Sequence, residues 1–273
     1  MARTLVLVLT CTLAAGHAVW ASANSSRTQE SNAEVGDPIG QTDLGLALIE
    51  GRSRRRDAPA GIAWLLKAAE QGHPLAQRLM GDILSTGKLV PKDDAAALRW
   101  YQRAAAGGDA DAQAELGSRY TQGWGVETND ALAVMWEEKG AAAGSVEAST
   151  YLGARYATGR GVPQDLAKAV VHYRRAAEGG SAVGMCLVGY MTQRGEGTEP
   201  NPQEAYRWYF AAFAATPAPR LLRPIEMRLV GSRRVACERF LKETRNQLTP
   251  DARAAAEREA RQWLSSHPPV ALP

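Results

Sequence analysis

Few residues in this chain have the types and spacing that catalysis or metal binding requires. After the first 23 residues the sequence holds three histidines, His73, His172 and His267, and two cysteines, Cys186 and Cys237. The histidines are too far apart in sequence to form a metal-ligand motif, and none adjoins an acidic pair. The motifs GxSxG, HExxH and CxxC are absent, so no nucleophile or metal site can be assembled from motifs. We therefore expect no enzymatic activity and no cofactor.

The elements that position these side chains follow from a repeat of 36 residues. Glycine marks the repeat in two complete columns, which are Gly45, Gly81, Gly117, Gly153, Gly189 and Gly51, Gly87, Gly123, Gly159, Gly195. A third column runs through Gly72, Gly108, Gly144 and Gly180 and stops at Thr216. A period of about 20 to 50 residues is typical of stacked repeat proteins, so the fold class is predicted before any individual helix.

Each repeat predicts two helices, most clearly the third repeat. Asp109 can cap the first helix, whose apolar stripe is Ala112, Leu116 and Tyr120, and Asn129 can cap the second. A glycine within a helix costs about 1 kcal/mol relative to alanine, so the first glycine column predicts a close approach of two helix backbones. A column of large rings is expected to be core, with a packed histidine at its fourth position; its members are Trp64, Trp100, Trp136, His172 and Trp208.

The two ends of the chain differ from the repeats. The first residues have the layout of a secretory signal, with Arg3, an apolar run too short to span a bilayer, and small residues that predict cleavage after Ala23, with Ala21 as the alternative. The predicted segments are the signal peptide at 1–23, a flexible polar lead-in at 24–36, five repeats at 37–216, C-terminal capping helices at 217–267 and a tail at 268–273.

A family resemblance rests on two consecutive segments, ELGSRYTQGWGVETNDALAVMWEEKGAAAG and YLGARYATGRGVPQDLAKAVVHYRRAAEGG. Both segments resemble the Sel1-like repeat, a relative of the tetratricopeptide repeat, whose pattern is an LG, a tyrosine, GxGV, an Asp cap, an AxxW and a closing AAxxG. Ser53 and Leu89, at the second loop glycine, and Thr216, at the closing glycine, depart from the pattern. The resemblance implies an all-α, right-handed superhelical solenoid that holds other proteins through its concave face.

Two rows of variable residues on the first helices are the predicted binding surface. One row is Asp43, Leu79, Glu115, Tyr151 and Leu187, and the row one helical turn further is Ala47, Ile83, Arg119, Arg155 and Met191. Arg78, on the same helices, is a further predicted partner contact. The first inter-helix loop contains a cluster, Arg52, Arg54, Arg55 and Arg56, which predicts either a solvated loop or a dock for an acidic partner or anionic envelope polymer.

The two cysteines that follow the predicted signal peptide have two interpretations. A disulfide between Cys186 and Cys237 would tie the last repeat to the C-terminal helices, as is common in an oxidising compartment. Two separate buried thiols are the alternative. Their spacing fits no metal motif.

Charge and hydropathy limit the classes of partner that the sequence predicts. The chain has 32 Lys and Arg against 29 Asp and Glu, and its basic C-terminal end is mixed with acidic residues, so we expect no nucleic acid partner. No second long apolar run follows the predicted signal peptide, so we expect no integral membrane segment in the mature chain. We expect a periplasmic or secreted adaptor with a protein partner in an envelope complex. The alternatives are a glycan-binding accessory protein and a hydrolase of the β-lactamase-like Sel1 type, although those relatives carry a cysteine pair in each repeat.

Overall fold

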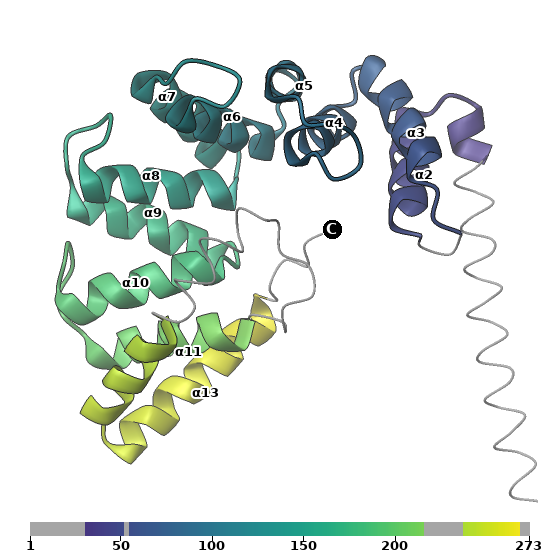
Figure 1. The fold of residues 1–273 in the computed structure, drawn as a ribbon. Coiled ribbons are helices and arrows are strands. Elements are labelled where there is room, and N and C mark those ends of the chain that lie inside the picture. The colour runs from purple at the N-terminus through teal and green to yellow at the C-terminus, as the bar shows by residue number, and fades with distance from the viewer. Residues whose placement is uncertain (1–30, 52–54, 216–236, 268–273) are drawn as a thin grey trace, which may run out of the picture. The chain divides into compact units, whose positions relative to one another are not determined.

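Helices supply all the regular structure in the computed structural model, which describes residues 31–51, 55–215 and 237–267 (Figure 1). No strand occurs within these ranges. The predicted signal peptide, Arg52, Arg54 and the tail lie outside the described residues. The chain forms two compact units, Met1–Ala112 with Trp124–Val126, and Gln113–Gly123 with Glu127–Pro273.

Two helices make up each repeat, and each of the first nine helices of the repeats has 13 residues. In chain order the helices are α2 (Pro38–Glu50), α3 (Ala58–Glu70), α4 (Pro74–Thr86), α5 (Asp94–Ala106), α6 (Ala110–Gln122), α7 (Asp130–Ala142), α8 (Val146–Thr158), α9 (Leu166–Glu178), α10 (Ala182–Arg194), α11 (Pro202–Ala215) and α13 (Pro250–Ser266). The predicted all-α organisation is confirmed.

Polar side chains begin these helices as the sequence predicted. The caps of the second helices, Asp57, Asp93, Asn129, Asp165 and Asn201, each accept a backbone N–H three residues ahead. At the first helices Asp37, Asp109, Ser145 and Ser181 do the same. Each such cap stabilises its helix by about 1 kcal/mol. His73 makes no side-chain cap bond, and Pro74 begins that helix instead.

The first glycine column lies where the two helices of a repeat touch. A Cβ on Gly153 would lie 2.5 Å from the ring of Tyr173, and one on Gly45 would lie 2.8 Å from the carbonyl oxygen of Gly61. Neither space admits a methyl group, so the predicted close approach is confirmed. The side chains that face the column are buried, and they are Leu65, Tyr101, Glu137, Tyr173 and Tyr209.

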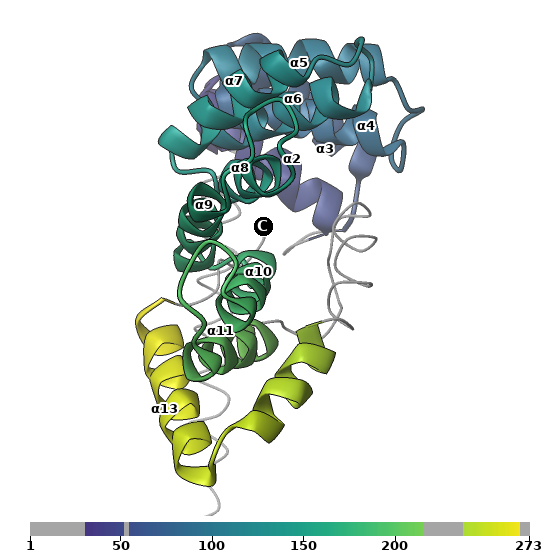
Figure 2. The same ribbon diagram turned by 90° about the vertical axis from the view of Figure 1, so that its left-hand side faces the viewer.

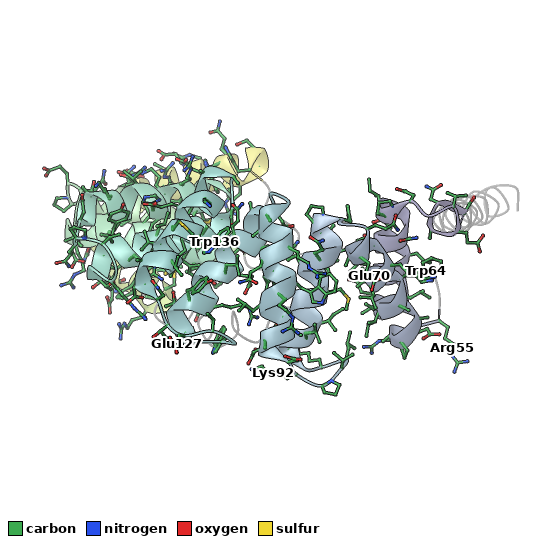
Figure 3. The ribbon with its side chains drawn as sticks, turned by 90° about the horizontal axis from the view of Figure 1, so that it is seen from above. Arg55, Trp64, Glu70, Lys92, Glu127 and Trp136 are labelled. Carbon is green, nitrogen blue, oxygen red and sulfur yellow. A yellow bond between two sulfur atoms is a disulfide. The ribbon has the colours of Figure 1, made fainter. Side chains whose placement is uncertain are left out.

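The tryptophan column is only partly core. Trp208 is buried, but Trp64, Trp100 and Trp136 are half-buried (Figure 3). Their rings carry the cations Lys67, Arg103 and Lys139, at 4.1, 4.9 and 4.6 Å from the respective centroids. The prediction is only partly confirmed for these three: Trp100 packs against the core cluster that contains Leu65, but the next residue along each helix, about 100° further round, takes the fully buried position.

His172 occupies the tryptophan position of the fourth repeat and is half-buried, as a packed histidine would be. Its ring stacks on that of Tyr156 with centroids 5.4 Å apart. Its Nδ1 is buried without a hydrogen-bond partner in the part of the chain that the structure describes. Burial, together with the positive charge of Arg175, lowers the pKa of His172.

The predicted flexible lead-in is helical at its end. Residues 31–34 form a helical turn, Ala33 is buried, and Gln41 donates its side-chain N–H to the Ala33 carbonyl at 3.2 Å. Gln77 makes the same bond to Ala69 one repeat later. Gly36 has a φ of +91°, which extends the third glycine column one repeat earlier. This turn therefore reproduces the end of a second helix, and the sequence signal for it was Gly36.

Two further helices follow the repeats, at 237–247 and α13, and both lie within the predicted capping segment 217–267. Figure 2 shows α13 beside α11. Trp263 meets Trp208 edge to face with centroids 5.4 Å apart, and Tyr206 donates to the Glu257 carboxylate at 2.9 Å. The predicted role of these helices as a cap agrees with this packing against the last repeat.

Candidate protein-binding surface

The first predicted row is accessible to solvent in every repeat. Asp43 is exposed, and Leu79, Glu115, Tyr151 and Leu187 are partly exposed. One turn earlier on the same helices lies a second accessible row that the sequence analysis missed: Ile39, Leu75, Asp111, Glu147 and Val183. The i, i+4 spacing could have found it, because such residues share a helix face. We call these two rows the first-helix face; both compact units carry part of it.

The second predicted row is buried, which corrects its assignment as binding surface. Ala47, Ile83, Arg119, Arg155 and Met191 are all at most 9% exposed. Side chains in this row point toward the neighbouring repeat, as Arg155 of α8 does toward Glu137 of α7. In the sequence these arginines look like exposed residues that could contact a partner. Only the packing of the structure shows that they are buried.

Arg155 lies at the centre of a buried polar network. Its Nε donates to Glu137 at 2.5 Å, and its Nη1 contacts Asp130 and the Arg160 carbonyl, each at 3.2 Å. Its Nη2 donates to the Thr121 hydroxyl. Every side of the guanidinium is thus satisfied within the second unit, so a partner has no access to it.

Burial raises the pKa of Glu137, against the opposing hydrogen bond and charge of Arg155. For Arg155, burial acts in the lowering direction, but Glu137 and Asp130 outweigh it and raise the pKa. The pKa of Asp130 is lowered, because its contacts with Arg160 and Arg155 outweigh its desolvation. The network is therefore an ion-paired cluster in which Glu137 is the member most easily protonated.

Arg78, another predicted contact, is also buried. Its guanidinium pairs with Asp82 at 3.5 Å on its own helix and with Asp109 at 3.2 Å at the start of the next first helix. A weaker contact joins it to Asp111 at 3.9 Å. Arg78 of α4 is therefore paired with carboxylates on its own helix and at the start of α6, and its role as a partner contact is corrected to a structural one.

The described arginines of the first inter-helix loop are accessible to solvent. Arg55 and Arg56 are exposed, and Figure 3 shows Arg55 extending away from the helices. Arg56 donates its Nε to the Ile49 carbonyl at 2.9 Å.

Cys186 of α10 and Cys237 form a disulfide, which resolves the two interpretations of the sequence. Their Cα atoms are 5.9 Å apart, a usual separation for this bond. Phe240, one turn further, packs against Tyr190 and Tyr209 with centroids 5.3 and 5.9 Å apart. The 237–247 helix is thus bound to the last repeat both covalently and by apolar contact.

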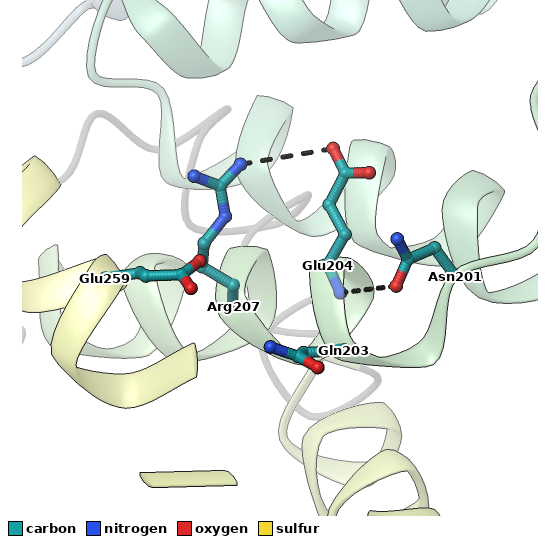
Figure 4. A pocket seen from close by; sticks show the side chains of 5 residues that line it. All are labelled: Asn201, Gln203, Glu204, Arg207 and Glu259. Carbon is teal, nitrogen blue, oxygen red and sulfur yellow. Dashed lines mark hydrogen bonds and ion pairs between the residues drawn. The ribbon is translucent and has the colours of Figure 1, made fainter. Parts of the chain in front are cut away.

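A shallow polar cleft lies between α11 and α13 (Figure 4). Its lining residues are Asn201, Gln203, Glu204, Arg207 and Glu259. Glu204 pairs with Arg207 at 4.0 Å and with Arg174 at 3.0 Å, and its N–H donates to Asn201. These charges compensate one another, and the lining contains no histidine or cysteine. The cleft offers no arrangement of nucleophile and base.

Within residues 31–51, 55–215 and 237–267, no three His, Cys, Asp or Glu side chains are grouped as metal ligands. In the same ranges, every helix is too short or too polar to span a bilayer.

Paired helices, repeated every 36 residues and held together at mid-helix glycines, define an all-α helical-repeat protein. A family model for the Sel1 repeat matches five consecutive segments, at residues 38–73, 74–109, 110–145, 146–181 and 182–215. The chain belongs to the Sel1 repeat family. Proteins of this family are generally protein-interaction scaffolds.

Solved structures of other repeat proteins are similar to this chain. A Sel1 repeat protein from Oxalobacter formigenes is 37% identical with a TM-score of 0.69, over 71% of this chain and 80% of that one. The protein c5321, described as a protective antigen present in uropathogenic Escherichia coli strains displaying an SLR fold, is 28% identical with a TM-score of 0.74. The match covers 89% of this chain but 49% of c5321, so this chain spans about half its length. No curated protein matches the chain in sequence.

Proposed function

We propose that the protein is a non-catalytic adaptor that binds a protein partner on its first-helix face. The observation that carries the proposal is the contrast between two kinds of row. The rows that begin at Ile39 and Asp43 stay accessible in all five repeats, whereas the row that begins at Ala47 is buried in all five. Accessible positions that recur with the repeat are how a stacked repeat protein builds an extended binding surface.

The chemistry of the first-helix face suits a protein ligand. In the second unit Tyr151, Val183 and Leu187 supply apolar area, and Glu115 and Glu147 supply charge on the same helices. Aromatic and apolar anchors bordered by polar side chains are typical of protein interfaces. The family's general role as a protein-interaction scaffold supports the same conclusion.

We further propose that the protein is exported and acts in the periplasm or outside the cell. The predicted cleavage after Ala23 motivates this, and the Cys186–Cys237 disulfide supports it because such bonds persist in oxidising compartments. The test is the molecular mass, measured by mass spectrometry, of the protein recovered from a periplasmic or culture fraction. A chain beginning at Asn24 is expected, and full-length protein confined to the cytoplasm would refute export.

Site-specific crosslinking tests the binding face. A photoreactive residue placed at Tyr151 or Leu187 is expected to capture the same partner protein in cells, as identified by mass spectrometry. Ala167, exposed on α9 and away from the first-helix face, is the matched control position. Capture at Ala167 but at neither Tyr151 nor Leu187 would contradict the proposed face.

A further inference from the structure

The inter-helix loops of the repeats differ sharply in charge. In the first two loops, residues 51–57 and 87–93, the sequence has six Arg and Lys against two Asp. In the remaining three, residues 123–129, 159–165 and 195–201, it has one Arg against four Asp and Glu. Loops at equivalent positions of successive repeats therefore carry opposite net charge.

The two acidic residues of the first two loops do not offset the cations. Asp57 and Asp93 are helix caps whose carboxylates accept the backbone N–H groups of Ala60 and Ala96 at 3.1 and 2.8 Å. A carboxylate at a helix N-terminus interacts with the positive end of the helix dipole, so its charge is already compensated locally. The cations of these two loops therefore outnumber the carboxylates beside them.

Four described cations make up what we call the basic loop edge: Arg55, Arg56, Lys88 and Lys92. All four are exposed. Arg56 and Lys92 occupy equivalent positions in successive repeats, and Figure 3 shows Arg55 and Lys92 on the same side of the unit. Lys92 also pairs with Asp94 at 2.9 Å, which holds its side chain beside the second loop.

The apolar residues of the second loop point inward. Leu89 and Val90 pack against the core cluster that contains Leu65, Met80 and Ile83. Surfaces that insert into membranes need exposed apolar side chains next to their cations. The apolar side chains of this loop, Leu89 and Val90, pack against the core instead. The arginine forks of the first loop match carboxylates in geometry, which favours a protein ligand rich in Asp and Glu.

We propose that the basic loop edge is an electrostatic docking surface for an acidic segment of a partner protein. The inference rests on the proposed adaptor function and names one part of the partner's chemistry. Docking at exposed cations accelerates encounter and weakens with salt, because exposed charges are screened over about 8 Å at physiological ionic strength. The first-helix face would then supply the less salt-sensitive contacts.

Binding of fluorescein-labelled poly-L-glutamate to the purified protein, followed by anisotropy, is the direct test. Saturable binding at low salt is expected, falling by about tenfold or more as the salt rises to about 150 mM. The double variant Arg55→Glu with Arg56→Glu should weaken binding by at least about tenfold at low salt. The matched control reverses two exposed cations on the helices of the same unit, Lys67→Glu with Arg99→Glu, and should change binding less than threefold.

Three results would overturn the proposal. They are absence of polyglutamate binding, an equal loss in the control variant, and tighter binding to phosphatidylglycerol vesicles than to polyglutamate. Circular dichroism of both variants shows that they remain folded. None of these results affects the crosslinking test at Tyr151 and Leu187, so failure of the loop edge is distinguishable from failure of the adaptor proposal.

Discussion

The Arg155 guanidinium of α8 lies 2.5 Å from the Glu137 carboxylate of α7, and both side chains are almost completely buried. In the repeats on either side, a tyrosine takes the place of Glu137, at Tyr101 and Tyr173. The pair is thus a polar substitute for an aromatic contact between successive repeats. A buried ion pair of this kind is costly to break at one end, whereas replacing both ends with apolar groups is often neutral.

This relationship predicts a non-additive pair of substitutions. Arg155→Met leaves Glu137 buried without its partner and should cost about 3 to 5 kcal/mol of unfolding free energy. Adding Glu137→Tyr reproduces the contact between Tyr173 and Met191, and should recover most of that loss. Urea denaturation of both single variants and the double variant measures the coupling. Arg160→Met, which removes solvent-accessible contacts to Asp130 and to the Thr121 carbonyl, is the control and should cost less than about 1 kcal/mol.

A second prediction concerns the mid-helix glycines. Gly153→Ala should gain helix propensity of about 1 kcal/mol, yet the added Cβ would meet the Tyr173 ring at 2.5 Å. Overpacking of this kind costs about 1 to 3 kcal/mol, so we expect a net loss of stability in thermal denaturation. Thr158→Ala, at the exposed end of the same helix, should change stability by less than about 0.5 kcal/mol. A raised melting temperature for Gly153→Ala would contradict the packing.

The disulfide gives a third prediction. Cys186→Ser should lower the unfolding free energy by about 2 to 4 kcal/mol and increase hydrogen exchange in the 237–247 helix. Cys237→Ser should have the same effect, and the double variant should be no less stable than either single one. Dithiothreitol should destabilise the wild-type protein but leave the double variant unchanged. A larger loss in the double variant would show that each cysteine contributes mainly through its own packing.

His172 predicts a pH dependence. Its pKa is lowered in the folded protein by burial and nearby positive charge, so the folded state favours the neutral ring. Below the unfolded pKa of about 6.5, the unfolded chain binds more protons than the folded one. The stabilisation that the neutral His172 ring contributes is therefore complete above about pH 6.5, and it is lost as the pH falls toward the pKa of the folded state.

The measurement is the melting temperature between about pH 7.5 and 5.5. His172→Trp restores the residue found at the equivalent position of the other repeats, and should lose less stability on acidification than the wild type. Equal acid losses in the two proteins would refute the role of this histidine.

Local features of the fold were predictable from the sequence, and the burial of charged residues was not. The caps and loop glycines act within a few residues, so Asn129 and Gly123 indicate helix boundaries by themselves. Arg155 was misassigned because its burial depends on Glu137 of the preceding repeat. The change from tyrosine to Glu137 in the core column was the available signal for Arg155. The core column itself was displaced by one residue from the expected tryptophans, and helical periodicity does not distinguish two adjacent positions at a half-buried boundary.

The disulfide replaces a contact that recurs between repeats. Thr42 bonds to His73 and Arg78 to Asp109, each across 31 residues, at the start of the next first helix. Cys186 occupies the equivalent position and reaches Cys237 across 51 residues, at the start of the 237–247 helix. Non-covalent stacking requires a constant period, whereas the entropy of closing a cross-linked loop rises only logarithmically with its length. The disulfide therefore holds the final helix pair to the last repeat at a spacing that does not follow the period of the array.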